Sequence, residues 1–254
     1  MRKLFFILTT LLVVTNCLSQ DNKAIKSGEK LVYAASYNMS GLMTQLAQVT
    51  METETVKTTK NTLLHLSCQA TTYSKWDSFF KIRDLYESYV NPITLKPSLY
   101  KRDIFEGKYS KKEKYIFKNE GRTIESTVTK KGKETKKTFN VGASTQDVIS
   151  LLYKLRTIDF SAMKPGQMKT FVVVFDEKEM TASAKFMGKE TVSAGNLGKK
   201  ECYKISIGAK TQALKGTDKN IIWLTADTKK VPALIKFSIP VGTGQITLTN
   251  ASGL

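Results

Sequence analysis

The chain has 254 residues and a formal net charge of +18, and a chain of this length can bury a substantial core. After the N-terminal segment it contains no second long apolar run and no Pro- or Ser-rich linker, so we expect a single domain over residues 20–254. One histidine, three cysteines and no CxxC pair exclude a His/Cys metal site, and neither a metal nor a cofactor is predicted.

Residues 1–19 have the pattern of a signal peptide. A basic start precedes an apolar run from Leu4 to Val14, which is too short to span a bilayer, and Cys17-Leu18-Ser19 supplies small residues for cleavage. We therefore predict export to the periplasm. An alternative interpretation is a lipoprotein signal, in which Cys17 is the lipid attachment site and anchors the protein to a membrane. Asn16 departs from that pattern, which requires Gly, Ala or Ser.

The remaining chain shows mostly a period of two in its apolar residues, which is typical of β-strands. Residues 64–70, 203–207 and 245–249 alternate between apolar and polar, whereas runs at 171–175 and 221–224 suit strands buried on both faces. Turn residues separate about fourteen candidate strands. We predict an all-β, mainly antiparallel fold, either a curled barrel or half-barrel or, as the alternative, a two-sheet β-sandwich.

One segment, near 145–156, has the spacing of an amphipathic helix. Ser144 can cap it, and apolar residues follow at steps of three and four: Val148, Leu151, Leu152 and Leu155. Asp147 and Arg156 suit its two ends because of the helix dipole. We expect the helix to lie across the mouth or open side of the curled sheet, and packing against an outer face is the alternative.

Two cysteines remain if cleavage follows Ser19. Cys68 and Cys202 both lie in strand-like runs, where a cysteine is more often a small packed residue than half of a disulfide. An oxidising compartment would permit them to pair, so both interpretations stay open.

Basic charge is concentrated between Lys108 and Lys137, where there are eleven Lys or Arg and four Glu on three strand-like segments. Lysines on exposed strands prevent edge pairing, which is the structural interpretation. The functional alternative is attraction to an anionic membrane surface, weakened by salt. Nucleic acid is not an expected partner, because no recognised nucleic-acid module is present. A short apolar segment, Trp76 to Phe80, is either a lid or a packed loop.

Several segments in a fixed order resemble one exported bacterial family. They are SGEKLVY at 27–33, residues 147–156, the stretch from Gly195 to Tyr203, WLTAD at 223–227 followed by Val231-Pro232, and Gly244-Gln245-Ile246. The chain is similar to domain of unknown function 3108 over nearly all of its mature length. The resemblance implies a largely antiparallel β protein of the Gram-negative envelope, Bacteroidetes-like, with no established activity. In architecture the chain also resembles lipoprotein-carrier half-barrels, which hold acyl chains inside a curved sheet.

No catalytic arrangement is visible, since a Ser-His-Asp triad would have to use His65 and no G-x-S-x-G motif is present. We predict a non-catalytic binding protein for an apolar or amphipathic, lipid-like ligand, with Tyr153, Arg156 and Trp223 as candidate ligand-binding residues. Each also has a structural interpretation, Tyr153 and Trp223 in packing and Arg156 as a last-turn cation. The alternative function is a structural or assembly factor of the envelope without a small-molecule ligand. We expect a monomer, whose partner is a lipid, an anionic membrane surface or an envelope protein.

Overall fold

The computed structural model describes residues 24–39, 41–209, 220–239 and 242–254, so the predicted signal peptide and Cys17 lie outside the described residues. Fourteen antiparallel strands form one sheet in the order β8-β7-β6-β5-β4-β3-β2-β1-β14-β13-β12-β11-β10-β9. The strands are β1 (Lys30–Met39), β2 (Leu42–Lys57), β3 (Thr62–Thr72), β4 (Arg83–Val90), β5 (Pro97–Glu106), β6 (Tyr109–Lys118), β7 (Thr123–Lys130), β8 (Lys133–Asn140), β9 (Met168–Phe175), β10 (Lys178–Ser193), β11 (Lys199–Ala209), β12 (Ile221–Thr225), β13 (Pro232–Ile239) and β14 (Gly242–Ser252).

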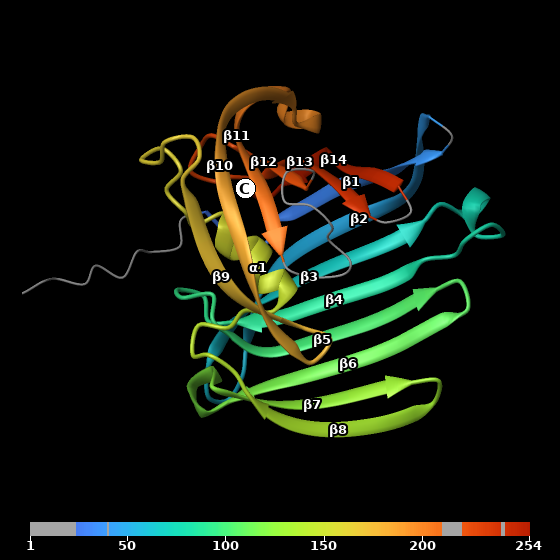
Figure 1. The fold of residues 1–254 in the computed structure, drawn as a ribbon, viewed down its shortest axis with the longest axis vertical. Coiled ribbons are helices and arrows are strands. Elements are labelled where there is room, and N and C mark those ends of the chain that lie inside the picture. Colours follow the sequence, from blue (N-terminus) through green and yellow to red (C-terminus); the bar gives the residue numbers. More distant parts are fainter. Residues whose placement is uncertain (1–23, 40, 210–219, 240–241) are drawn as a thin grey trace, which may run out of the picture.

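The strand order follows from two meanders that meet in the middle of the sheet. Strands β1 to β8 each pair with the next, the chain returns through helix α1 (Val148–Leu155), and β9 to β14 again pair in sequence. The last strand then pairs with the first, with Lys30 opposite Ser252. The two ends of the folded chain therefore lie side by side, while β8 and β9 form the two edges of the sheet (Figure 1).

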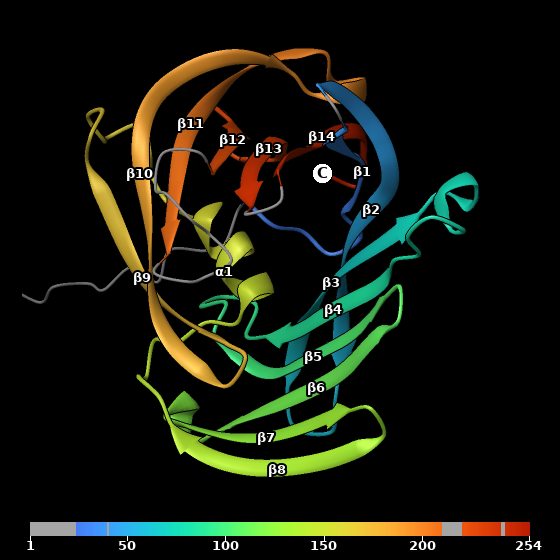
Figure 2. The same ribbon diagram turned by 45° about the vertical axis from the view of Figure 1, so that its right-hand side comes forward.

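The sheet curls around α1, so that the helix lies inside the curve (Figure 2). Within the described residues β8 and β9 share no ladder, so the barrel is not closed by backbone pairing. The predicted half-barrel with one amphipathic helix is confirmed, and the two-sheet β-sandwich is not observed. Three short 3₁₀ turns accompany the helix: η1 (Ser74–Trp76), η2 (Asn119–Gly121) and η3 (Gly195–Leu197). No helix of the described part of the chain is both long and apolar enough to cross a membrane.

Side chains join the two edge regions of the sheet. Asp176, in the turn between β9 and β10, contacts Arg102 of β5 and accepts a hydrogen bond from Lys111 of β6 at 2.8 Å. Arg102 is buried and also pairs with the buried Glu113 at 2.6 Å. The next turn residue, Glu177, accepts a hydrogen bond from the Ser126 hydroxyl of β7 at 2.7 Å. The half-barrel is thus closed by ionic contacts and hydrogen bonds rather than by a ladder.

Helix α1 begins at a buried carboxylate. Asp147 is the N-cap, and its Oδ1 accepts hydrogen bonds from the backbone N–H groups of Ile149 and Ser150 at 2.9 and 2.8 Å. The Ser150 hydroxyl accepts in return from the Asp147 backbone N–H, which completes a capping box. Burial raises the pKa of Asp147 to about 6, against the opposing effect of these hydrogen bonds and of one from Ser88.

The prediction that Ser144 caps the helix is wrong, because the segment before Asp147 is held in an extended conformation. The Gln146 backbone N–H donates to the Val172 carbonyl at 2.9 Å, and its carbonyl accepts from the Val174 N–H at 2.8 Å. Gln146 thereby covers part of the free edge of β9. This explains how an edge strand can carry a run of buried residues: Val173 and Val174 are both buried, whereas Met168 to Thr170 are exposed.

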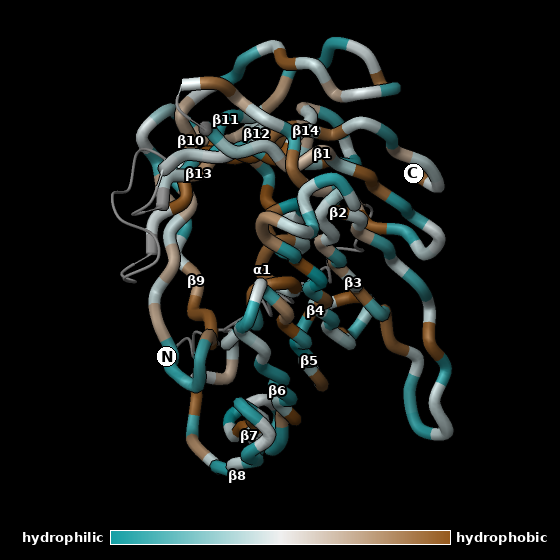
Figure 3. Tube along the Cα trace, turned by 90° about the vertical axis from the view of Figure 1, so that its right-hand side faces the viewer, coloured by the Kyte–Doolittle hydropathy of each residue, from teal (hydrophilic) through white to brown (hydrophobic). Residues whose placement is uncertain are grey.

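The helix divides the interior into two apolar clusters. Ile149 and Tyr153 pack with residues of β1 to β3, whereas Leu155 packs with the inner faces of β10 to β12. Figure 3 shows apolar residues on α1 and on the part of β9 beside it. Cys68 and Cys202 are both free, as expected for packed cysteines, and burial raises the pKa of the Cys202 thiol to about 11.

Candidate ligand pockets beside the helix

An apolar pocket with a volume of about 410 Å³ lies between α1 and strands β9 to β13. Four helix residues line one side of it: Val148, Leu151, Leu152 and Leu155. The strands supply Val173, Phe175, Met180, Ala182, Ile207, Ile221, Ile222, Ile235 and Phe237, and Asn220 and Lys236 complete the lining. Small-molecule sites are mostly apolar clefts of about 300–1,000 Å³ with a few polar groups, so both size and composition fit this class.

The apolar stripe of α1 explains why the side of the pocket formed by the helix is apolar. Residues at steps of three and four share one helix face, so the residues from Val148 to Leu155 that predicted the helix are the ones that face the pocket. Leu151 and Leu152 are only partly buried, because the sheet does not fill the space opposite them. On the far side the buried Ala182 of β10 contributes only a methyl group, which leaves room between helix and sheet.

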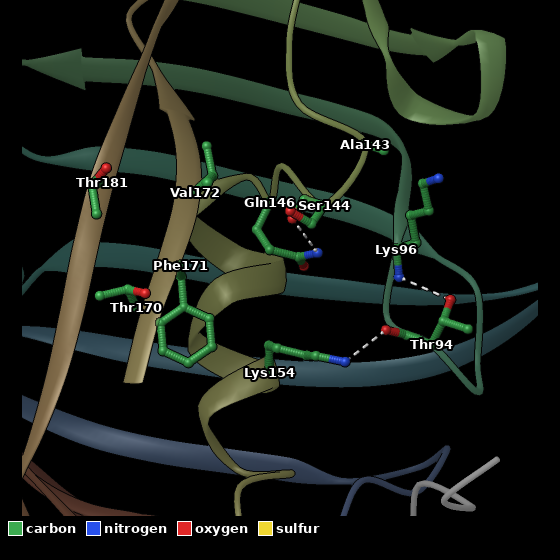
Figure 4. Close-up of a pocket in the computed structure, with 10 residues that line it drawn as sticks. All are labelled: Thr94, Lys96, Ala143, Ser144, Gln146, Lys154, Thr170, Phe171, Val172 and Thr181. Atoms are coloured by element: carbon green, nitrogen blue, oxygen red, sulfur yellow. Dashed lines mark hydrogen bonds between the residues drawn. The ribbon is translucent and has the colours of Figure 1, made fainter. Parts of the chain in front are cut away.

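A second pocket, of about 420 Å³, adjoins the first along β9 and α1. Phe171 and Val172 line the second pocket, while Val173 and Phe175 of the same strand line the first. Lys154, three residues after Leu151 on the helix, lies on the side of the second pocket (Figure 4). The connection between β4 and β5 and the segment before α1 form its other walls.

The second pocket is more polar than the first, and it is cationic. Lys96 and Lys154 line it, and neither forms an ion pair with a carboxylate of the described residues. The Lys154 ammonium donates a hydrogen bond to the Thr94 carbonyl at 3.1 Å (Figure 4). The carboxylate of Glu179, beside the segment before α1, accepts hydrogen bonds from the Gly142 backbone N–H at 2.7 Å and from the Thr145 hydroxyl. The pocket therefore offers positive charge to an incoming anionic group.

One buried polar side chain in this pocket lacks a full set of partners. Gln146 is 6% exposed, and its Nε2 donates to the Ser144 carbonyl at 3.5 Å, but its Oε1 has no hydrogen-bond partner among the described residues. A buried acceptor without a partner costs about 1–3 kcal/mol. A ligand hydroxyl or amine that donates to Gln146 would remove this cost.

Tyr153 lies on the opposite side of the helix from the apolar pocket. Its ring is fully buried, and its hydroxyl accepts a hydrogen bond from the Thr53 hydroxyl of β2 at 3.2 Å. Burial raises the pKa of Tyr153 well above its ordinary value. The side chain therefore contributes to the packing of α1 on β1 to β3.

Arg156 forms a buried ion pair that fixes the end of the helix. Its Nη1 and Nη2 each lie 2.6 Å from an oxygen of Glu29, and both side chains are at most 1% exposed. Nη2 also donates to the carbonyls of Ala24 and Lys229, both at 3.0 Å. Burial alone would lower the pKa of Arg156, but the hydrogen bonds and charge of Glu29 raise it. Arg156 thus connects three separate chain segments.

Trp223 is 3% exposed and lies between two cations on the other face of the sheet from the helix. The ammonium groups of Lys204 and Lys236 lie 5.6 and 5.5 Å from its ring centre, and its indole N–H donates to Glu190 at 3.2 Å. Hydrogen bonds from Lys204 and Trp223 hold the pKa of Glu190 below its ordinary value.

Neither pocket is lined by any of the three predicted site residues, whose role in ligand binding stays a prediction. The residues that do line the apolar pocket, such as Leu151 and Leu152, had a signal in the sequence, namely the helix stripe itself. That stripe predicts an apolar partner, but it does not reveal whether side chains or a ligand fill the space opposite. Asp227, at the end of the WLTAD segment, accepts from the Thr225 hydroxyl at 2.9 Å and belongs to the following turn.

The half-barrel places the protein in the class of β-barrel-like folds. Its fold is similar to the crystal structure of a beta-barrel-like protein of domain of unknown function DUF1849 from Brucella abortus, with a TM-score of 0.60, 8% identity, and coverage of 89% of this chain and 97% of that chain. A Bacteroides fragilis protein with a YmcC-like fold aligns over 89% of this chain and 96% of that chain, at 9% identity and a TM-score of 0.33. No curated protein matches the sequence.

The family is more specific than the fold class. A family model described as Protein of unknown function (DUF3108) matches residues 32–249. The chain therefore belongs to this family, as the ordered sequence landmarks indicated, and the family brings no activity with it.

Proposed function

We propose that the protein is an exported, non-catalytic binding protein for an apolar or amphipathic, lipid-like ligand. The observation that carries the proposal is the apolar pocket of about 410 Å³ against one face of α1. An envelope assembly factor without a ligand would need its interior filled by side chains, and the partly exposed Leu151 and Leu152 favour the binding protein instead. Export is inferred from the N-terminal pattern, with the periplasm as the proposed location and anchoring through Cys17 as the alternative.

The apolar part of the ligand lies in this pocket. Transfer of a methylene group from water to an apolar site contributes about 0.8 kcal/mol, which is roughly a fourfold gain in affinity. In a series of fatty acids, affinity should therefore rise about fourfold with each added methylene until the pocket is full, and then level off.

The polar end of an amphipathic ligand lies in the adjoining polar pocket. Lys96 and Lys154 attract an acidic group there, and Gln146 accepts a hydrogen bond from a hydroxyl or amine of the ligand. Replacing both lysines by glutamine should weaken the binding of a fatty acid more than that of the corresponding alcohol, since only the acid carries a negative charge. Equal weakening of both ligands would contradict this placement.

Titration of delipidated protein with a fluorescent fatty acid tests the proposal. Ala182→Phe fills the apolar pocket, and Leu151→Gln makes its wall polar at a partly exposed helix position where glutamine is well tolerated. Thr191→Phe, on an exposed position of β10 outside the pocket, is the control. We expect binding to the native protein and the control, and loss of at least tenfold in affinity in both pocket variants. Absence of binding to the native protein, or unchanged binding in both pocket variants, would refute the proposal.

A further inference from the structure

The predicted loop at Trp76 to Phe80 lies at one end of the sheet, together with the turns that join β5 to β6 and β7 to β8 (Figure 1). Four large aromatic side chains are exposed there: Phe79 (72%), Phe80 (47%), Phe105 (40%) and Tyr109 (39%). We call these four residues the aromatic rim. The other aromatic rings of the described residues are buried or half-buried, and exposed apolar patches mark interaction sites.

Contacts join the turns that carry the rim at this end of the sheet, where Phe105 and Tyr109 lie on opposite faces because Tyr109 pairs with Glu106. The Gly107 backbone N–H donates to the Lys81 carbonyl at 2.8 Å, which joins the loop before β4 to the turn between β5 and β6, and the Phe80 ring lies against Gly107. The indole N–H of Trp76 donates to the Gln45 carbonyl of β2 at 2.9 Å. The segment is therefore a packed loop, fixed by hydrogen bonds on both sides, and it presents Phe79 to solvent.

On the same turns positive charge exceeds negative charge, which is carried by Asp77 and by Glu106 at the end of β5. Five exposed lysines lie on these turns: Lys75, Lys81, Lys108, Lys130 and Lys131. Two of them touch the rim, with the Lys81 ammonium 6.0 Å from the ring centre of Phe105 and the Lys130 ammonium 5.2 Å from that of Tyr109. None of the five pairs with a carboxylate of the described residues, and the acid within the loop, Asp77, is neutralised by Arg83 at 2.5 Å.

We propose that the aromatic rim and its five lysines dock the protein on an anionic lipid bilayer. The rings enter the interface between head groups and acyl chains, while the ammonium groups remain at the level of the lipid phosphates. The combination of aromatic residues and unpaired lysines is complementary to this surface in both polarity and charge. The proposal goes beyond ligand binding, because no rim residue lines either pocket.

The topology places the apolar pocket near the same end of the strands. In a meander all turns from an odd-numbered to an even-numbered strand lie at the same end of the strands. These turns include those of the rim and the turn between β9 and β10. Met180, Ile207 and Phe237 of the pocket lie near their strand ends on this side.

Sedimentation of the purified protein with vesicles tests the docking. Vesicles of phosphatidylcholine with added phosphatidylglycerol should bind the protein, with affinity falling as salt rises, and pure phosphatidylcholine should bind it far less. The rim triple variant carries Lys108→Gln, Lys130→Gln and Lys131→Gln. Its matched control removes the same charge at exposed lysines elsewhere: Lys169→Gln, Lys199→Gln and Lys200→Gln. Each rim lysine should contribute about fivefold, so the rim triple should lose on the order of a hundredfold in affinity.

A second measurement reports on contact itself. Trp76 is partly exposed beside the rim, whereas Trp223 is 3% exposed, so quenching of tryptophan fluorescence by brominated lipids reports Trp76. We expect quenching in the native protein and loss of it in Phe79→Ser/Phe80→Ser. The proposal would be overturned if the two triple variants lost affinity equally, if the native protein showed no quenching, or if neutral vesicles bound the protein as well as anionic ones. Ala182→Phe should keep vesicle binding, which separates failure of docking from failure of ligand binding.

Discussion

Removal of the Arg156 guanidinium should be among the most destabilising single changes in the protein. Arg156→Met keeps the length and apolar character of the side chain but leaves Glu29 buried, at 1% exposure, without its cation. It also removes the donors that serve the carbonyls of Ala24 and Lys229. Breaking a buried ion pair by removing one partner costs about 3–5 kcal/mol. For a domain of this size that cost corresponds to a fall in Tm of about 6–20 °C.

The double variant separates the ion pair from other effects of the substitution. Replacing a whole buried pair by apolar residues of similar volume is often close to neutral. We therefore expect Arg156→Met/Glu29→Met to be more stable than Arg156→Met alone. In the single variant a proton on Glu29 would remove the unpaired buried charge, so the loss of stability should be smaller at low pH than at pH 7.

Urea unfolding followed by tryptophan fluorescence measures these free energies at several pH values. For Arg156→Met we expect a large loss in the free energy of unfolding at pH 7 and a smaller loss near pH 4. The double variant should recover part of the free energy lost at pH 7. A loss below about 1 kcal/mol at pH 7, the size typical of an exposed pair, would refute the structural role assigned to Arg156. A double variant as unstable as the sum of the two singles would refute the coupling.

Three further predictions concern single positions. Burial raises the pKa of Asp147 to about 6, so between pH 4 and 6 the folded protein binds a proton that the unfolded chain lacks. The free energy of unfolding should therefore fall as pH rises through this range, and it should fall less in Asp147→Asn. Urea midpoints at several pH values measure the difference. Gly195→Ala places a Cβ 2.5 Å from the Thr249 carbonyl oxygen at a φ of +58°, so thermal unfolding should reveal a loss of about 2 kcal/mol or more. Tyr153→Phe removes the hydroxyl that contacts Thr53, so the free energy of unfolding should fall by about 1 kcal/mol while fatty-acid affinity is unchanged. A loss of affinity at unchanged stability would instead support the ligand-binding role predicted for Tyr153 from the sequence.

The fold could largely be predicted because its signals are local. The alternation at 64–70 and 203–207 lies within β3 and β11, the basic segments after Lys108 correspond to β6, β7 and β8, and the apolar stripe lies within α1. The exact start of the helix could not be predicted, because it depends on Gln146 pairing with β9, some 26 residues further along the chain.

The sites depend on contacts between distant segments, which periodicity does not contain. Arg156 and Glu29 are 127 residues apart, and both have common alternative uses at a helix end or on a strand. The contacts that close the half-barrel join Asp176 to Arg102 and Lys111, which lie 74 and 65 positions before it in the chain. The pocket depends on the space between α1 and Ala182, which no single segment determines.

Docking of the turn between β10 and β11 is a further feature without a sequence signal. Asn196 of η3 exchanges two hydrogen bonds with the backbone of Ala251, at 3.0 and 2.8 Å, so the turn lies on the end of β14. The sequence indicates a turn at this position, since Gly195 and Gly198 both permit a positive φ. It does not indicate that the turn packs on another strand.

The central claim is that the apolar pocket carries a ligand, and native mass spectrometry tests it most directly. The protein is purified gently from the cells that make it, measured, extracted with organic solvent and measured again. We predict an adduct of lipid-like mass that disappears on extraction and that is absent from Ala182→Phe. The mass of the bare protein in every preparation would contradict the account and would favour the alternative function of an envelope assembly factor without a small-molecule ligand.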